Sequence, residues 1–391
     1  MRQIPSSEFT FITICLKVFK NKTDYLLLHS LLKKSDENEL INTALKHGVL
    51  PLVYKTLKEK SLITSNINNS LLLRLKKHYH SIAKQNISMS AELIQINSLL
   101  TKHQIRIIAF KGPALAQLAY GDITLRQFSD IDLLISQKDV ISTYKLLEKT
   151  YKTTLPLKSL QYGICLNVNN DIAFRDAKKN IWIELHWKLF REKITQNIEF
   201  EYIIQNTQTI KINNRSILTF SNELYIVYLC LHGSKHAWER LEWICDIDRL
   251  IHASNTTLDW SMIDQLATKL DSKTTLYLGL SLSHLLFDTP LPKHIEKEIA
   301  NPSVITLTDK TLKLLHHDFF NLKGYARYNL IHQYQRELLE TQYAKLKHIL
   351  HTYFSISRND CEFLPLPKPL IFLYFVIKPF RVAWKYITSN E

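Results

Sequence analysis

Glycine and cysteine are scarce in this chain. Only 7 of its 391 residues are glycine, which favours a helix-dominated fold over a loop-rich β fold. The five cysteines are widely spaced, and no two of them form a CxxC pair. This spacing argues against a disulfide framework or a zinc motif, and it predicts a reduced, cytoplasmic protein.

Long apolar runs are also missing. The longest covers residues 370–377, far below the roughly 20 residues that a membrane-spanning helix needs. Near the N-terminus, Lys17 interrupts the apolar stretch 9–19, and no small-residue cleavage site follows it. We therefore expect neither a transmembrane segment nor a signal peptide.

Acidic residues are outnumbered by basic ones. The 36 Asp and Glu residues stand against 50 Lys and Arg residues, which gives a net charge of +14. This balance favours anionic partners such as nucleotides, nucleic acid or a lipid surface. A general bias toward Ile, Lys and Asn explains the charge equally well, because the lysines are dispersed along the chain.

The length and the hydrophobic pattern predict three regions. Helical periodicity predicts one helical region over residues 1–103 and a helical domain over residues 221–391. Residues 104–220 alternate strands and helices in the order β-α-β-α-β, with strands at 105–110, 131–135 and 181–187. The predicted fold class is α+β, a small mixed-sheet core flanked by N- and C-terminal helical regions.

Two carboxylates interrupt the apolar run of residues 129–135. Residues two apart on a strand point to the same face, so Asp130 and Asp132 are expected side by side. Adjacent anions repel unless a cation lies between them, and Mg²⁺ prefers oxygen ligands of this kind. The pair predicts a metal site that serves phosphate chemistry.

A third carboxylate lies in the strand predicted at residues 181–187. Alternation along this strand places Trp182, Glu184 and His186 on one face. If the strand lies beside that of Asp130, Glu184 completes a three-carboxylate cluster that can hold two Mg²⁺ ions. For His186, a structural hydrogen bond and a contact with substrate fit the pattern equally well.

Polar residues next to these strands are candidates for binding a nucleotide. Lys111 and Gly112 follow a strand and precede a helix, whose N-terminus favours anions. Arg126 lies four residues before the first carboxylate, and we expect it either to contact a phosphate or to lie on the surface. Ser129, directly before that carboxylate, is expected among the nucleotide contacts.

A helix predicted over residues 229–251 carries a polar stripe at spacings i, i+3, i+4 and i+7, formed by His232, Lys235, His236 and Glu239. We expect Lys235 and a histidine, His232 or His236, to meet the nucleotide phosphates or the substrate. The alternatives are a solvated helix face and a metal site, although no HExxH pattern is present.

The segment KGPALAQLAYGDITLRQFSDIDLLIS, with IELHW downstream, resembles the uncharacterised nucleotidyltransferase family of the DNA polymerase β-like superfamily. The superfamily pattern is a glycine-containing turn and helix, Asp-x-Asp on a strand, and an acidic residue on a later strand. The matching positions are Gly112, Asp130, Asp132 and Glu184. Residues 229–251 also resemble the downstream helix of the family.

The chain departs from the superfamily at one position of the turn. Pro113 stands where the superfamily has a serine, and proline offers neither a hydroxyl nor an N–H to a phosphate. Phosphate binding must then depend on the Gly112 N–H, on Lys111 or on residues elsewhere.

The resemblance implies a Mg²⁺-dependent nucleotidyltransferase with a two-metal site. Such an enzyme transfers an NMP from an NTP, here expected to be ATP, to a hydroxyl or similar acceptor on a small molecule, peptide or protein, and releases pyrophosphate. The alternative is a non-catalytic nucleotide-binding or toxin–antitoxin-type partner that keeps the same fold. Scattered basic residues and the lack of an RNA-binding module argue against a nucleic-acid substrate.

The C-terminal stretch 365–388 mixes aromatic residues with Lys378, Arg381 and Lys385. This pattern is compatible with peripheral contact with a membrane surface, with a protein partner, or with a closing helix that packs its aromatic side chains on the domain.

Overall fold

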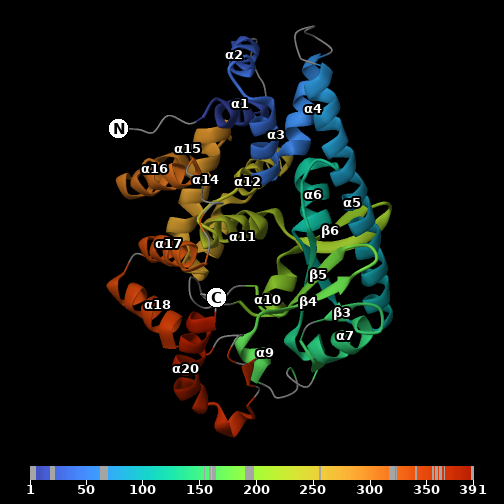
Figure 1. Cartoon of the computed structure of the whole chain (residues 1–391), viewed down its shortest axis with the longest axis vertical. Helices are drawn as coiled ribbons and strands as arrows, with labels where there is room; N and C mark the ends of the chain where they lie inside the picture. Colours follow the sequence, from blue (N-terminus) through green and yellow to red (C-terminus); the bar gives the residue numbers. More distant parts are fainter. Residues whose placement is uncertain are drawn as a thin grey trace.

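The computed structural model describes residues 6–17, 23–61, 69–153, 155–157, 160, 164–189, 198–254, 257–316, 322, 324–339, 341–354, 356, 360, 363–364 and 366–388. Cys361 and Pro365 lie outside the described residues. Helices dominate, and a five-stranded sheet lies among them (Figure 1), so the predicted α+β class is confirmed.

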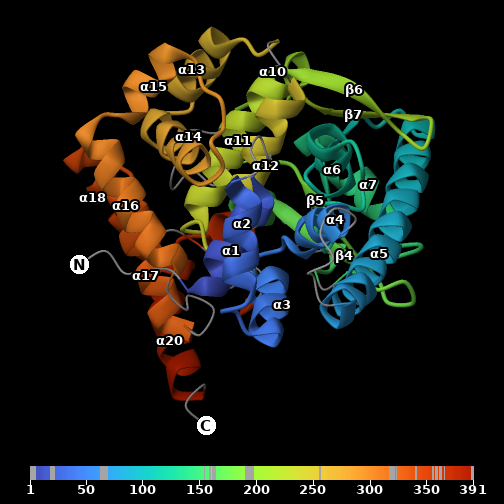
Figure 2. The same ribbon diagram turned by 90° about the horizontal axis from the view of Figure 1, so that it is seen from above.

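Five helices precede the sheet in the sequence: α1 (Ser7–Leu16), α2 (Thr23–Leu32), α3 (Glu37–Lys46), α4 (Leu50–Ser61) and α5 (Asn69–Lys102). Side-chain caps fix two of their starts: Ser6 accepts from the N–H of Phe9, and Asp36 accepts from the N–H of Glu39. The last of the five, α5, is much the longest and runs along one side of the sheet (Figure 2).

The main sheet has the strand order β1-β2-β5-β4-β3. Its strands are β1 (Ile107–Phe110), β2 (Asp130–Ile135), β3 (Lys152–Thr153), β4 (Asp171–Asp176) and β5 (Ile181–His186). The pair β2–β5 is parallel, whereas β1–β2, β3–β4 and β4–β5 are antiparallel. The three predicted strands are present, but the prediction omitted β3 and β4, which complete the sheet beyond β5.

The two helices predicted in the core are α6 (Gly112–Tyr120) and α7 (Val140–Leu147). Pro113 stands in the first turn of α6, and Gly121 ends this helix with a left-handed backbone at φ 67°. The short elements η1 (Gln137–Asp139) and α9 (Ile164–Val168) complete the connections.

The two faces of the sheet pack differently. On one face, apolar side chains such as Ile131, Leu133 and Ile183 join a core with the C-terminal half of α5 and with α7. On the other face, Phe110 and Leu134 join the larger core of the helical regions. The polar residues of β2 and β5 share this second face, and the C-terminal helices cover it.

A second, two-stranded sheet lies beside β1. It is a hairpin of β6 (Thr207–Ile212) and β7 (Arg215–Phe220), preceded by α10 (Phe200–Gln205). Asn213 and Asn214 turn the hairpin with φ of 46° and 60°, the positive values that a two-residue hairpin turn needs. The sequence prediction omitted this hairpin, although its two asparagines carry the signal.

The helical pattern resumes at Asn222, as predicted, and continues through α11 (Asn222–Lys235), α12 (Leu241–Ser254), α13 (Trp260–Lys269), α14 (Lys273–Phe287), α15 (Lys293–Ile299), α16 (Pro302–His316), α17 (Gly324–Glu337), α18 (Gln342–Phe354), η3 (Lys368–Leu370) and α20 (Leu373–Thr388). No helix in the described part of the chain is long and apolar enough to cross a membrane.

The single helix predicted over residues 229–251 is wrong, because the chain breaks between α11 and α12. Ala237 and Trp238 adopt positive φ of 52° and 55°. The Trp238 ring folds back onto Gly233, where an added Cβ would lie 2.4 Å from the ring. The backbone N–H of Trp238 donates to the Gly233 carbonyl at 2.8 Å, and this bond closes the turn that ends α11.

Candidate functional site

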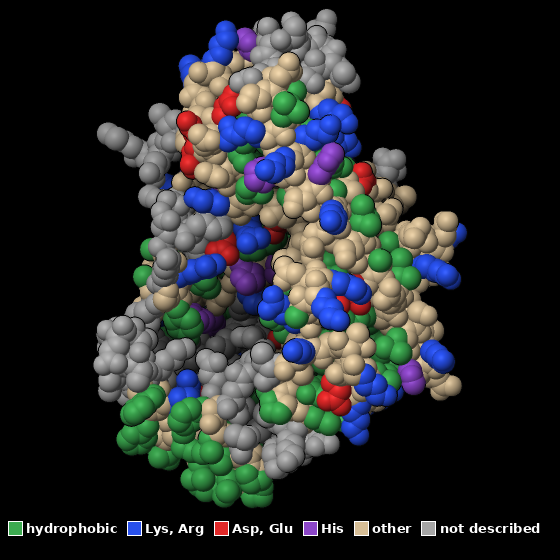
Figure 3. Space-filling view, turned by 45° about the vertical axis from the view of Figure 1, so that its right-hand side comes forward, with side chains coloured by type: hydrophobic (Ala, Val, Ile, Leu, Met, Phe, Trp, Pro, Cys, Tyr) green, Lys and Arg blue, Asp and Glu red, His purple; other side chains and the backbone are tan. Residues whose placement is uncertain are grey.

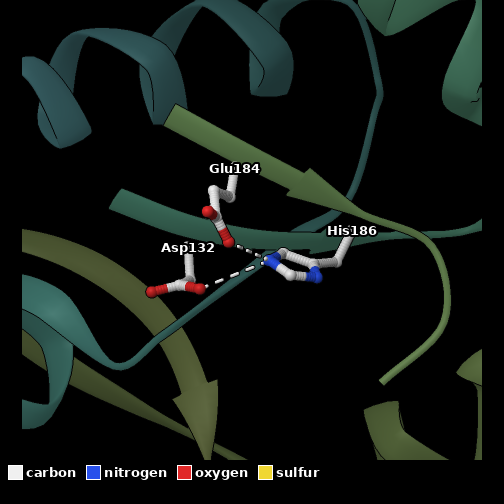
Figure 4. A group of neighbouring side chains, drawn as sticks. All are labelled: Asp132, Glu184 and His186. Carbon is white, nitrogen blue, oxygen red and sulfur yellow. Dashed lines mark ion pairs between the residues drawn. The ribbon is translucent and has the colours of Figure 1, made fainter. Parts of the chain in front are cut away.

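The parallel pairing of β2 with β5 builds the centre of the site. Register places Asp132 directly opposite Glu184, and His186 lies one pleat further along the same face. Figure 4 shows one nitrogen of the His186 imidazole facing both carboxylates. Its Nε2 lies 3.3 Å from Asp132 Oδ1 and 3.3 Å from Glu184 Oε2.

Lys111 supplies a second positive charge at this centre. Its Nζ lies 2.8 Å from Asp132 Oδ1, and the Asp132 side chain is 0% exposed. Burial acts to raise the pKa of Asp132, but Lys111 and His186 outweigh it and hold this pKa at about 2. Asp132 is therefore ionised near neutral pH although it is fully buried.

The neighbouring carboxylates also shift the pKa values of His186 and Lys111. Burial acts to lower the pKa of His186, but its contacts with Asp132 and Glu184 raise it to about 9. Burial opposes the charge of Lys111 too, yet Asp132 raises the pKa of Lys111 well above its usual value. The contact with His186 lowers the pKa of Glu184.

The pKa of Asp130 shifts in the opposite direction to that of Asp132. Burial, followed by repulsion from Asp132, raises the pKa of Asp130 to about 7. Its carboxylate lies outside the group of ligand atoms formed by Asp132, Glu184 and His186, which all lie within 4.8 Å of one another. Three carboxylates thus share one sheet face with very different proton affinities.

The turn between β1 and α6 is strained and tightly packed. Lys111 has φ 59° and Gly112 has φ 42°, both in the left-handed region. A Cβ on Gly112 would lie 2.9 Å from the backbone carbonyl oxygen of Asp130. Gly112 therefore lets the turn approach β2 closely, and this approach brings Lys111 to Asp132.

Arg126, predicted either at a phosphate or on the surface, is buried and paired with the carboxylate of Asp246. Its Nε and Nη2 each lie 2.8 Å from one oxygen of Asp246, which also accepts from Tyr120. Asp248 of the same helix accepts a hydrogen bond from Thr289 instead. Arg126 still lines the pocket described next, but its guanidinium is already paired.

A pocket of about 770 Å³ opens over the carboxylates, within the size range of small-molecule sites. Most of the predicted site residues line it: Lys111, Arg126, Ser129, Asp130, Glu184, His232, Lys235 and His236. Gly112 and Asp132 lie beneath the surface of the pocket. Figure 3 shows the hollow, with histidine and basic side chains inside it.

The wall opposite the sheet comes from α11, the break after it and the start of α12. The rings of Tyr228, His232, His236 and Trp243 pack against one another, with centroids 4.9 to 5.9 Å apart. Burial, reinforced by nearby Lys111, holds the pKa of His232 well below its usual value. Burial and Lys235 lower the pKa of His236 to about 3, so both imidazoles are neutral near pH 7.

Sequence reasoning missed several pocket residues. Tyr228, Arg240, Glu242 and Trp243 flank the predicted stripe, but the helical pattern marked them as apolar or unremarkable. Four residues of α17 also line the pocket: Tyr328, Ile331, His332 and Gln335. The sequence held no signal for these, because only the packing of α17 on α11 brings them near the sheet.

The donor set fits a divalent cation. Asp132 Oδ2 is buried and has no hydrogen-bond partner among the described residues. His186 Nε2 faces two carboxylates without a well-formed hydrogen bond to either. Carboxylate and imidazole donors of this kind are typical of divalent metal sites, and the only such group of three among the described residues is Asp132, Glu184 and His186.

Comparisons with known proteins identify the family of the chain. A family model described as an uncharacterised nucleotidyltransferase matches residues 33–288, more than half of the chain. No curated protein matches. A solved antigenic nucleotidyltransferase-like protein from Paracoccidioides brasiliensis is similar at 17% identity and a TM-score of 0.29, over 49% of this chain and 91% of that chain.

Proposed function

The chain belongs to the uncharacterised nucleotidyltransferase family, and we propose that it transfers an NMP from an NTP to an acceptor hydroxyl, releasing pyrophosphate. The acceptor is a group on a small molecule, a peptide or a protein, and ATP is the proposed donor. The observation that carries the proposal is the carboxylate cluster beneath a pocket whose other walls are basic and aromatic.

Asp132, Glu184 and His186 would hold Mg²⁺, and Asp130, two residues from Asp132 on the same face of β2, would complete the ligand set. The cation would neutralise charge on the triphosphate and on the attacking oxygen. Lys111 and His186 balance the charge of Asp132 when no metal is bound. His186 is an addition to the ligand set that the sequence predicts.

The basic groups of the pocket suit a triphosphate. Lys111, Lys235 and Arg240 line one cavity with the carboxylates, so anionic oxygens above the metal site meet positive charge. Ser129 lies at the exposed start of β2 and offers a hydroxyl. Gly112 supports phosphate binding indirectly, because it allows Lys111 to reach its position.

The transfer step needs an acceptor for one proton. The acceptor oxygen bonds to the α-phosphorus, the bond between the α-phosphorus and the pyrophosphate oxygen breaks, and the hydroxyl proton must leave. We assign this proton to Asp130, because its carboxylate lines the pocket on the sheet face that carries Asp132 and Glu184. A carboxylate has two oxygens, so this role is compatible with metal binding.

Three measurements on one set of variants test the proposal: binding of Mn²⁺ as a probe for the metal site, binding of a labelled NTP, and mass change of lysate components incubated with NTP and Mg²⁺. Asp132→Asn should weaken Mn²⁺ binding at least about tenfold and abolish labelled products. Glu201→Gln, on the exposed surface of α10, is the matched control and should change nothing.

Two outcomes would contradict the assignment. Equal Mn²⁺ binding and equal turnover by the wild type and Asp132→Asn would exclude the metal site. Tight NTP binding by the wild type without any Mg²⁺-dependent pyrophosphate release, even in lysate, would favour the non-catalytic nucleotide-binding protein instead.

A further inference from the structure

The last two long helices expose an unusual amount of apolar surface. Its exposed members, which we call together the α18–α20 apolar face, are Tyr343, Leu346 and Leu350 on α18, Phe372 just before α20, and Phe375, Val376, Phe380 and Trp384 on α20. Phe380 is 73% exposed and Trp384 is 67% exposed. Figure 3 shows hydrophobic side chains gathered at the lower end of the molecule, the end where α20 lies in Figure 1.

The exposed side chains of α20 form one continuous stripe. Phe372, directly before the helix, and Val376, Phe380 and Trp384 follow one another at spacings of four residues, and Phe375 lies beside them. The opposite side of the helix is held to the protein: Tyr374 is 1% exposed, and its hydroxyl donates to the Leu364 carbonyl at 2.7 Å. The helix is therefore docked by its other side, and its apolar stripe faces outward.

An ion pair fixes the same orientation. Arg381 Nε donates to Asp360 Oδ1 at 2.7 Å, and the Asp360 side chain is 0% exposed. Rotating α20 to bury its aromatic stripe would break this buried pair, which is costly when one charge is left behind. The outward stripe is thus part of the folded arrangement of this end of the chain.

The charge of the two helices favours an anionic surface. Helices α18 and α20 contain no Asp or Glu, but they contain Lys345, Lys347, Lys378 and Lys385 in addition to the paired Arg381. On α18, Lys347 is exposed directly next to the exposed Leu346. Basic residues next to exposed Phe, Trp and Tyr are the composition of helices that lie in the interface of an anionic membrane.

We propose that the α18–α20 apolar face docks on the surface of a bilayer that contains anionic phospholipids. The helices lie on the membrane and do not cross it, since none of the described helices is suited to span it. A second copy of the chain is a poorer occupant, because both faces would carry positive charge without acidic partners. This proposal is independent of the nucleotidyl transfer described above.

Vesicle binding tests the proposal. Full-length protein is sedimented with vesicles of phosphatidylcholine alone or of phosphatidylcholine mixed with phosphatidylglycerol, at low and high salt. We expect binding to the mixed vesicles, weaker binding to phosphatidylcholine alone, and loss at high salt. The double variant Phe380→Glu/Trp384→Glu should lower the partition coefficient by at least about tenfold, because two aromatic side chains no longer leave water.

The control is Leu73→Glu, which places one glutamate on another exposed apolar residue, 67% exposed on α5, and matches the single variant Phe375→Glu in charge. It should bind vesicles as the wild type does. Both variants change exposed positions, and matching thermal unfolding curves will show that they are folded. Phe375→Glu provides a second variant of the stripe, since it is also 56% exposed.

Three results would overturn the proposal: no binding of the wild type to mixed vesicles, equal binding of the wild type and the double variant, or equal loss in Leu73→Glu. Dimers that form without vesicles and disappear in the double variant, with no vesicle binding, would assign the face to a second copy of the chain.

Discussion

Lys111 and Asp132 form a buried ion pair, with Lys111 Nζ 2.8 Å from Asp132 Oδ1. The lysine ends β1 with a left-handed backbone, and the aspartate lies in the middle of β2. This pair ties the strained turn to the carboxylate cluster. It also places a side-chain cation where a metal-binding carboxylate needs positive charge, and the first prediction follows from that position.

Replacing Lys111 by Met should destabilise the metal-free protein and make it more responsive to Mg²⁺. Asp132 loses its nearest cation in a buried site, so the free energy of unfolding should fall by about 3 kcal/mol. Added Mg²⁺ should recover more of this loss than it adds to the wild type, because it supplies the missing positive charge. Urea unfolding with and without Mg²⁺ measures both quantities.

Lys178→Met is the matched control, since Lys178 is exposed in the turn between β4 and β5. It should leave the unfolding free energy and its Mg²⁺ dependence unchanged. If Mg²⁺ stabilises the wild type and Lys111→Met equally, the carboxylates beside Lys111 are not the metal site.

Asp130→Asn should stabilise the metal-free protein at high pH while lowering its activity. The pKa of Asp130 is raised from 3.8 to about 7 on folding, so the folded state binds the proton more tightly. This group therefore costs stability as pH rises from about 4 to 7. Asparagine carries no charge, so this loss is absent in Asp130→Asn. Its free energy of unfolding should exceed that of the wild type by on the order of 2 kcal/mol at about pH 8, with little difference near pH 4.

Comparing the two proteins at each pH removes the contribution of His186, which both share. That contribution is present below the ordinary histidine pKa and is lost as pH rises through about 9. NTP turnover of Asp130→Asn should fall about a hundredfold, since Asn cannot accept the proton. A variant with wild-type turnover would remove Asp130 from the chemistry, whatever its stability.

Arg126 and Asp246 should behave as one unit. Each single substitution, Arg126→Met or Asp246→Asn, leaves a buried charge without its partner and should cost about 3 kcal/mol of unfolding free energy. The double variant should cost less than the two losses combined, with a coupling of about 2 kcal/mol in a double-mutant cycle. Additive losses would show that the two residues act separately.

Nucleotide affinity separates the two roles considered for Arg126. If the guanidinium positions the helix α12 through Asp246, both single variants should weaken NTP binding to a similar extent. If it contacts a phosphate directly, Arg126→Met should weaken binding about tenfold more than Asp246→Asn.

Gly112→Ala should be more damaging than Gly121→Ala. Both glycines have positive φ, so both substitutions add backbone strain of about 1 kcal/mol. Only at Gly112 would the new Cβ press on backbone, 2.9 Å from the Asp130 carbonyl oxygen, whereas nothing lies within 4 Å at Gly121. We expect Gly112→Ala to lose roughly 2 kcal/mol or more and to weaken Mn²⁺ binding. Equal losses would exclude the close approach as the reason for this glycine.

The sequence predicted the elements that carry strong local patterns. The buried strands β1, β2 and β5, the helix α5, and the restart of helix at Asn222 all follow from hydrophobic periodicity. The strand β3 has only two residues and is too short to show such a pattern. In β4 the buried Ile172 and Phe174 alternate with more exposed residues, a signal that the prediction passed over. The hairpin β6–β7 depends on Asn213 and Asn214 at its turn. The break at Trp238 was missed because apolar spacing continues through it.

The sequence by itself determined that Asp130 and Asp132 share a strand face and that Glu184 shares one with His186, because the β pleat repeats every two residues. Only the tertiary structure decided that β2 and β5 pair in parallel, with Asp132 opposite Glu184. The tertiary structure also pairs Arg126 with Asp246, 120 residues away, and places α11 and α17 over the carboxylates. Periodicity is a local property, whereas pairing, burial and the resulting proton affinities depend on residues distant in the chain.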